Sequence, residues 1–154
     1  MKYYIGEYWK MANSNNPKVR EEGIIKWNEA AKKYGPYYET IKNKLPKKFL
    51  IEFEKNSEFH DFTFDNINIA NSGKNISTVE WVINHEDVSY KITLSGARGF
   101  TIDVPNSQWW LFGKLSWGYT EFELNDDGTW IIRILCDIEC EIEVLFKRIS
   151  ILKL

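Results

Sequence analysis

The sequence predicts an α+β protein in which N-terminal helices pack on a curved antiparallel β-meander of about seven strands. Up to residue 56 apolar residues recur about one helical turn apart, whereas from Phe59 onward they alternate with polar residues. Turn residues then recur every ~8 to 12 residues, which is typical of consecutive antiparallel strands. We expect one domain over residues 1–154, helical over 1–56 and a sheet over 57–154, because 154 residues suffice for one core.

The first predicted helix covers residues 17–34. Asn16 supplies an N-cap, Pro17 fits the first helical position, and Gly35-Pro36 predicts the end of the helix. One apolar stripe runs along this segment, formed by Val19, Ile24, Trp27, Ala31 and Tyr34.

Two shorter helical segments are expected before the sheet. The first is YYETIKNKL, residues 37–45, and the second is PKKFLIEFEKN, residues 46–56. In the second segment Phe49, Leu50 and Phe53 share one face. These helices need a sheet on which to bury their apolar sides.

The segment 78–94 predicts a β-hairpin with one apolar face. A two-residue turn at His85-Glu86 pairs Ile83 with Val88, Trp81 with Tyr90 and Val79 with Ile92. Glu80 then lies opposite Lys91 on the other face. A slip by one residue would move every apolar side chain to the wrong face.

Two further hairpins are expected over residues 119–146, with loops at 126–128 and 137–139. They pair Leu124 with Trp130, Phe122 with Ile132, Trp130 with Phe146, Ile132 with Val144, Ile134 with Ile142 and Cys136 with Cys140. The opposite face then carries a ladder of Glu121, Arg133 and Glu143. Two more strands are expected within residues 98–105 and 109–117.

Composition favours a soluble cytoplasmic protein. The N-terminal sequence has charged residues where a secretion signal needs an apolar run, and no stretch approaches the ~20 apolar residues of a membrane span. Residues 1–55 hold 12 Lys and Arg against 7 Asp and Glu, whereas residues 56–154 hold 8 against 15. We expect no nucleic-acid partner, since the net charge is −2 and the basic run 42–48 has no interleaved surface aromatics.

His60 and Asp61 are the first candidate site. His60 shares strand parity with Phe62 and Phe64, so Asp61 should point to the opposite face, and a phase shift predicts a bulge near Asp65-Asn66. This parity favours a structural, hydrogen-bonded histidine. The alternative is a cleft that contains His60, Asp61 and Asp65, in which the histidine takes part in catalysis or metal binding.

Trp109 and Trp110 are candidates for a binding surface, because exposed tryptophans stack on sugars, bases or a protein partner. Packing of these residues and of Trp117 in the core is the other interpretation.

Cys136 and Cys140 lack the spacing and the second ligand pair of a zinc site, so we expect neighbouring reduced thiols. We expect no catalytic residue, metal or cofactor.

Three short motifs carry a family resemblance: Met1 to Tyr4, Leu45-Pro46 with Phe49, and Phe59-His60-Asp61. Together they resemble a set of small, uncharacterised bacterial proteins, mostly from low-GC Gram-positive organisms, with an MKYF-like start, an LP..F helix and a Leu/Phe-His-Asp at the start of the sheet. The closing EIEVLFKRISI, residues 141–151, is similar to their last strand and to that of some toxin-immunity families.

The resemblance implies a domain of unknown function and, for the immunity-like relatives, a protein that binds and blocks a toxin. It transfers no catalytic residue. We therefore expect a non-enzymatic protein-binding domain that uses the acidic sheet half, with Glu121, Arg133 and Glu143, and the tryptophans Trp109 and Trp110. The alternative is an enzyme or small-ligand-binding domain with a cleft near His60.

Overall fold

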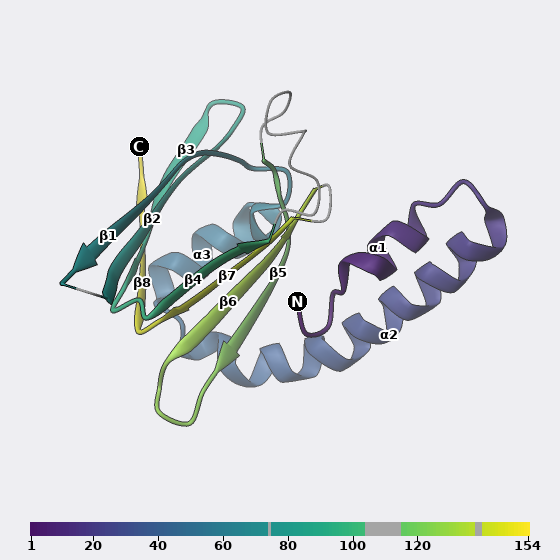
Figure 1. Cartoon of the computed structure of the whole chain (residues 1–154), viewed down its shortest axis with the longest axis horizontal. Coiled ribbons are helices and arrows are strands. Elements are labelled where there is room, and N and C mark those ends of the chain that lie inside the picture. The colour runs from purple at the N-terminus through teal and green to yellow at the C-terminus, as the bar shows by residue number, and fades with distance from the viewer. Residues whose placement is uncertain (74, 104–114, 138–139) are drawn as a thin grey trace.

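A computed structural model describes residues 1–73, 75–103, 115–137 and 140–154, and it confirms the α+β fold. In this part of the chain three α-helices pack on two antiparallel sheets of four strands each (Figure 1). The helical segments are α1 (Gly6–Ala12), α2 (Pro17–Ile41), η1 (Lys42–Lys44), α3 (Lys47–Lys55) and η2 (Ser57–Phe59). None of the described helices combines the length and apolar character that a membrane crossing requires.

The N-terminus of α2 is where the sequence predicts it. The Asn16 side chain accepts a hydrogen bond from the Lys18 backbone N–H at 3.1 Å, and Pro17 is the first helical residue.

The predicted end of this helix is wrong, because α2 continues through Gly35 and Pro36 to Ile41. Pro36 removes one helical hydrogen bond, but it lies on the exposed side of the helix, where water can solvate the carbonyl left without a donor. The side chains of Tyr34 and Tyr37 hold the helix on both sides of the proline: their hydroxyls accept hydrogen bonds from the backbone N–H groups of Phe122 (2.6 Å) and Leu124 (3.1 Å).

Helix α1 was not predicted from the sequence, and it lies along the first half of α2 (Figure 1). Gly23 permits this close contact, since a Cβ atom there would lie 2.3 Å from the backbone nitrogen of Ala12.

The strands form two sheets, which we call sheet A (order β1-β2-β3-β8) and sheet B (order β4-β7-β6-β5). Their bounds are β1 Thr63–Ser72, β2 Asn75–His85, β3 Val88–Ser95, β4 Gly99–Asp103, β5 Trp117–Leu124, β6 Trp130–Cys136, β7 Glu141–Phe146 and β8 Arg148–Lys153. The expected last strand is divided in two, because after Phe146 the chain leaves sheet B and joins the edge of sheet A as β8. The described residues thus hold eight strands where about seven were expected.

The predicted register of sheet B is confirmed. Leu124 pairs with Trp130, Phe122 with Ile132 and Glu121 with Arg133, and the loop between them contains Gly128 at φ 77°. Trp130 also pairs with Phe146, Ile132 with Val144 and Ile134 with Ile142. In sheet A the bulge predicted near Asp65-Asn66 is present between Phe64 and Asn66.

The predicted register of the β2–β3 hairpin is wrong by two residues. Its turn is Glu86-Asp87, so Ile83 pairs with Tyr90 and Trp81 with Ile92. A shift by two preserves side-chain parity, and the predicted apolar face is therefore still the buried one. Glu80 faces Thr93, and its ion pair with Lys91 is diagonal, at 3.6 Å.

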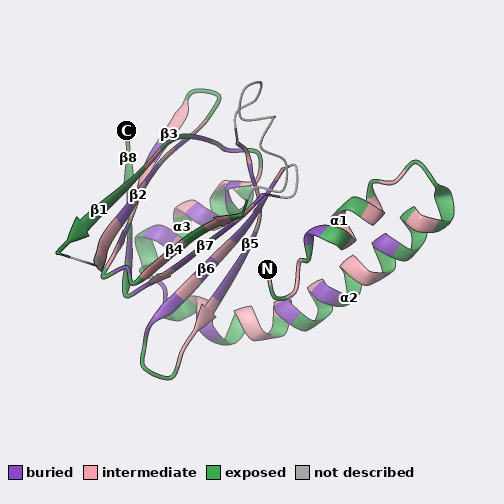
Figure 2. Ribbon diagram, in the orientation of Figure 1, coloured by how far each residue is buried: buried purple, intermediate pink, exposed green. Residues whose placement is uncertain are grey.

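The core lies between the two sheets and α3 (Figure 2). Trp81 of sheet A and Trp117 of sheet B are fully buried, with ring centroids 5.5 Å apart. Trp117 is therefore a core residue, and its indole N–H donates to the Thr120 hydroxyl at 2.7 Å.

Candidate functional site

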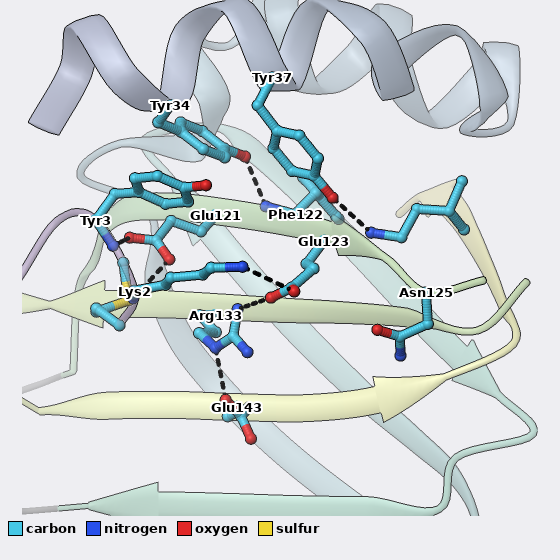
Figure 3. Close-up of polar contacts among 12 residues, drawn as sticks. Lys2, Tyr3, Tyr34, Tyr37, Glu121, Phe122, Glu123, Asn125, Arg133 and Glu143 are labelled. Atoms are coloured by element: carbon cyan, nitrogen blue, oxygen red, sulfur yellow. Dashed lines mark hydrogen bonds and ion pairs between the residues drawn. The ribbon is translucent and has the colours of Figure 1, made fainter. Parts of the chain in front are cut away.

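The acidic ladder on sheet B is buried at Glu121 and about half exposed at Glu143. Glu121 is only 1% exposed because the N-terminal segment covers it. Its carboxylate accepts hydrogen bonds from the backbone N–H groups of Lys2 (2.8 Å) and Tyr3 (2.7 Å) (Figure 3) and from that of Tyr4 (2.6 Å). The expectation that Glu121 forms part of a partner surface is therefore wrong.

Arg133 is paired on both sides. It donates to Glu123 at 2.8 Å and to Glu143 at 2.6 Å, and Lys2 donates to Glu123 at 3.0 Å (Figure 3). Desolvation raises the pKa of Glu123, but the hydrogen bonds from Arg133 and Lys2 outweigh it, so the pKa is lowered. Sequence reasoning missed Glu123, although its strand parity with Glu121 placed it on the same face.

The tryptophans proposed as a binding surface, Trp109 and Trp110, lie outside the described residues.

Cys136 and Cys140 are cross-strand neighbours as predicted. Both are buried, and the Cys136 N–H donates to the Cys140 carbonyl at 2.8 Å. Hydrogen bonding to Cys140, together with burial, raises the pKa of the Cys136 thiol, which disfavours the reactive thiolate.

His60 and Asp61 lie in a turn and not on a regular strand, so the prediction that they face opposite sides is wrong. The distance between His60 Nδ1 and Asp61 Oδ1 is 3.1 Å, and both side chains are accessible, at 40% and 73% exposure. The His60 ring packs edge-on against Tyr119 of β5, with centroids 5.1 Å apart. The histidine therefore lies beside the Asp61 carboxylate and is not sealed in the core.

The backbone before β1 is unusual. Ser57, Glu58 and Phe59 have φ angles of 51°, 60° and 62°, and Asp61 has a φ of 70°. Such left-handed conformations cost about 1–2 kcal/mol for each non-glycine residue. Residues 59–62 form a type II turn, closed by a hydrogen bond from the Phe62 N–H to the Phe59 carbonyl at 3.0 Å. We call residues 57–61, in which every residue except His60 has a positive φ, the left-handed segment.

We expect Glu58→Gly to raise the free energy of unfolding by about 0.5–1 kcal/mol, because glycine relieves the left-handed strain at some cost in unfolded-state entropy. Glu54→Gly is the matched control: it lies four residues earlier within α3, and glycine there should lower stability by about 1 kcal/mol. Urea denaturation of both variants measures the difference. Equal destabilisation by the two substitutions would show that Glu58 is not strained.

Two hollows flank the His60-Asp61 pair. One, of about 410 Å³, is lined by this pair with Asn56, Ser57, Phe62 and His85, and therefore contains both histidines of the chain. The other, of about 150 Å³, is lined by the pair with Trp9, Ser116, Tyr119 and Asp137, above a buried floor of Leu135 and Cys136. We call the second one the Trp9 hollow.

The predicted cleft is thus present in part. His60 and Asp61 line both hollows, whereas Asp65 lines neither and lies exposed at the β1 bulge. Sequence reasoning missed Trp9, Tyr119 and Asp137, since nothing local marks residues that meet only in the folded chain. Within the described ranges, no three His, Cys, Asp or Glu side chains are placed to hold a metal ion.

No protein-family model matches the chain, and no curated protein matches it. Among solved structures, the chain is similar to the crystal structure of an uncharacterized protein from Neisseria gonorrhoeae. The sequence identity is 17% and the TM-score is 0.47, and the match covers 60% of this chain and 91% of that one.

Proposed function

We propose that the chain is a protein-binding domain whose partner adds an extended strand to the edge of sheet A formed by β1. The observation that carries this proposal is the exposed, uncharged stretch Asn66–Ser72. Apart from the half-buried Ile67, every residue in it is exposed, and none carries a charge. Proteins often protect such edges with charges or proline, and this stretch has neither, which favours pairing with another strand.

The start of β1 is covered on its outer side, whereas its remainder has no described segment beside it. The Phe64 N–H donates to the Leu115 carbonyl at 2.8 Å, and Thr63 forms an isolated antiparallel bridge with Ser116. Beyond Asp65 no segment of the described chain pairs with this side of β1. Among the described residues, the backbone groups of 66–72 that face away from β2 have no partner strand, which makes them available to a strand from another molecule.

Side chains next to this edge define what the partner strand must contribute. Ile67 and Ile69 pair with Trp81 and Val79, which places them beside the core, yet Ile69 remains 37% exposed. A strand added to β1 would bury this apolar rim. A partner segment with alternating apolar residues fits best, because alternate residues of an added strand face the same side.

Charge supports a basic partner. The sheet half, residues 56–154, has an excess of seven acidic residues, and opposite charge on the partner favours association. The family resemblance makes a basic toxin from the same cell the first partner to test.

The test is the double substitution Asn68→Lys with Ile69→Lys, which places charge on both faces of the exposed edge strand. The matched control, Ile25→Lys with Asn28→Lys, adds the same charge on exposed positions of α2. The partner is first identified by pull-down of the tagged chain from its own cells with mass spectrometry. We then expect the edge variant to bind the purified partner at least about tenfold more weakly, with the control close to the unsubstituted chain.

Hydrogen exchange on the complex provides the direct readout. Amides in residues 66–72 should exchange more slowly once the partner strand is bound. Normal affinity of the edge variant, together with unprotected β1 amides, would refute the proposal, as would the absence of any stoichiometric partner.

A further inference from the structure

We infer that the Trp9 hollow binds an ammonium or guanidinium group, supplied by a lysine or arginine side chain of the protein partner. Only the source of the cation rests on the proposed function. The chemistry of the hollow follows from its own residues.

Two carboxylates give the hollow its charge. Asp61 is 73% exposed, and Asp137 is oriented by a hydrogen bond from the Ser116 backbone N–H to its Oδ1 atom at 2.9 Å. In the described part of the chain, neither carboxylate forms an ion pair with a lysine or arginine, in contrast to Glu123 and Glu143. The only basic side chain in the lining is that of His60. The hollow therefore attracts a cation and disfavours an anion.

Aromatic rings provide the second element of cation recognition. Tyr119 is held edge-on against His60 and against Trp27 of α2, whose ring centroid is 4.5 Å away. Trp9 contributes a second aromatic side chain from α1. The faces of tryptophan and tyrosine rings attract ammonium and guanidinium groups, and most strongly when water is partly excluded. Desolvation, followed by the charge of Asp61, raises the pKa of Tyr119, consistent with a partly dry and electronegative site.

Size and floor favour a side chain over a larger ligand. A volume of about 150 Å³ accommodates a cationic head group with part of its aliphatic stem. Leu135 and Cys136 are buried beneath it and offer an apolar surface to the methylene groups. The hollow lies at the covered start of β1, because Asp61 precedes this strand by two residues and Ser116 bridges to Thr63, and the proposed docking edge begins further along the same strand at Asn66. A partner strand on β1 can therefore place a cationic residue there.

The first test uses the complete chain without a partner, so it does not depend on the proposed function. Methylguanidinium and n-butylammonium chlorides are titrated while the tryptophan indole N–H signals are followed by NMR, with n-butanol as the neutral probe. We expect saturable shifts of the Trp9 signal with the two cations only. Saturable binding should weaken as sodium chloride is raised, because salt screens the carboxylates.

The variant Asp61→Asn with Asp137→Asn keeps side-chain shape and an oxygen acceptor for the Ser116 N–H. It should bind the cations about tenfold more weakly, whereas the control Asp65→Asn with Asp103→Asn, at exposed positions outside the hollow, should change affinity less than about twofold. Equal shifts with n-butanol, or unchanged cation affinity of the Asp61/Asp137 variant, would overturn the inference.

The source of the cation is settled with the same variants and the purified partner. Loss of partner affinity in the Asp61/Asp137 variant, but not in the Asp65/Asp103 control, assigns the cation to the partner. Unchanged partner affinity would overturn that assignment and leave a free amine as the ligand. If the β1 edge variant keeps its partner while the isolated chain binds the cations, the proposed docking edge fails and the hollow stands.

Discussion

Replacing Glu121 by alanine is expected to lower the free energy of unfolding by about 3 kcal/mol, because three backbone N–H groups lose their acceptor in a largely covered site. For a protein of this size such a loss corresponds to a fall in melting temperature of roughly 6–12 °C. Thermal and urea denaturation followed by circular dichroism measure both quantities. Hydrogen exchange should also accelerate at the amides of Tyr3 and Tyr4, since the N-terminal segment loses its attachment to β5.

The matched control is Glu143→Gln. Glu143 is about half exposed and has one ion pair with Arg133, so its loss should cost less than about 1 kcal/mol. If Glu121→Ala were as mild as this control, the N-terminal segment would not depend on Glu121.

Phe59→Ala is expected to have the largest effect, a loss of about 4 kcal/mol. The Phe59 ring is fully buried and contacts α3 through Phe53, sheet A through Tyr90 and sheet B through Trp117, each with a centroid separation of 5.5 Å. Deleting it removes packing from three elements at once. Urea denaturation gives the free energy, and a conservative Phe59→Leu variant should lose less than about 1.5 kcal/mol.

The same substitution tests how the left-handed segment is maintained. Strain at Ser57, Glu58 and Asp61 persists only if packing of the surrounding structure compensates for it, and Phe59 is the residue of this segment that packs in the core. Phe59→Ala should therefore also weaken cation binding in the Trp9 hollow. The control Ile51→Ala, at an exposed position of α3, should change stability by less than about 0.5 kcal/mol and leave cation binding intact. If the Phe59→Ala variant kept the free energy of unfolding of the unsubstituted chain, packing of Phe59 would not be what maintains the left-handed segment.

The candidate site was predictable only in part. His60 and Asp61 were identified from residue type, and both line the hollows, but their assignment to a strand was wrong. Positive φ angles at Ser57, Glu58 and Phe59 have no sequence signature, because the residues that usually adopt them are glycine and asparagine. The acidic ladder was correctly placed on one face, yet its role was misjudged because the N-terminal segment that covers Glu121 is 117 to 119 residues away in the chain.

Fold class, the apolar faces of the strands and the register of sheet B could be predicted from the amino-acid sequence. Those features follow from local periodicity and from short loops, which constrain neighbouring strands directly. Three other features became visible only in the folded chain: α2 passes through Pro36, β8 returns to sheet A, and Trp9, Asp61 and Asp137 meet in one hollow. The reason is that these features depend on contacts between residues far apart in the chain, where packing and hydrogen bonding outweigh local preference.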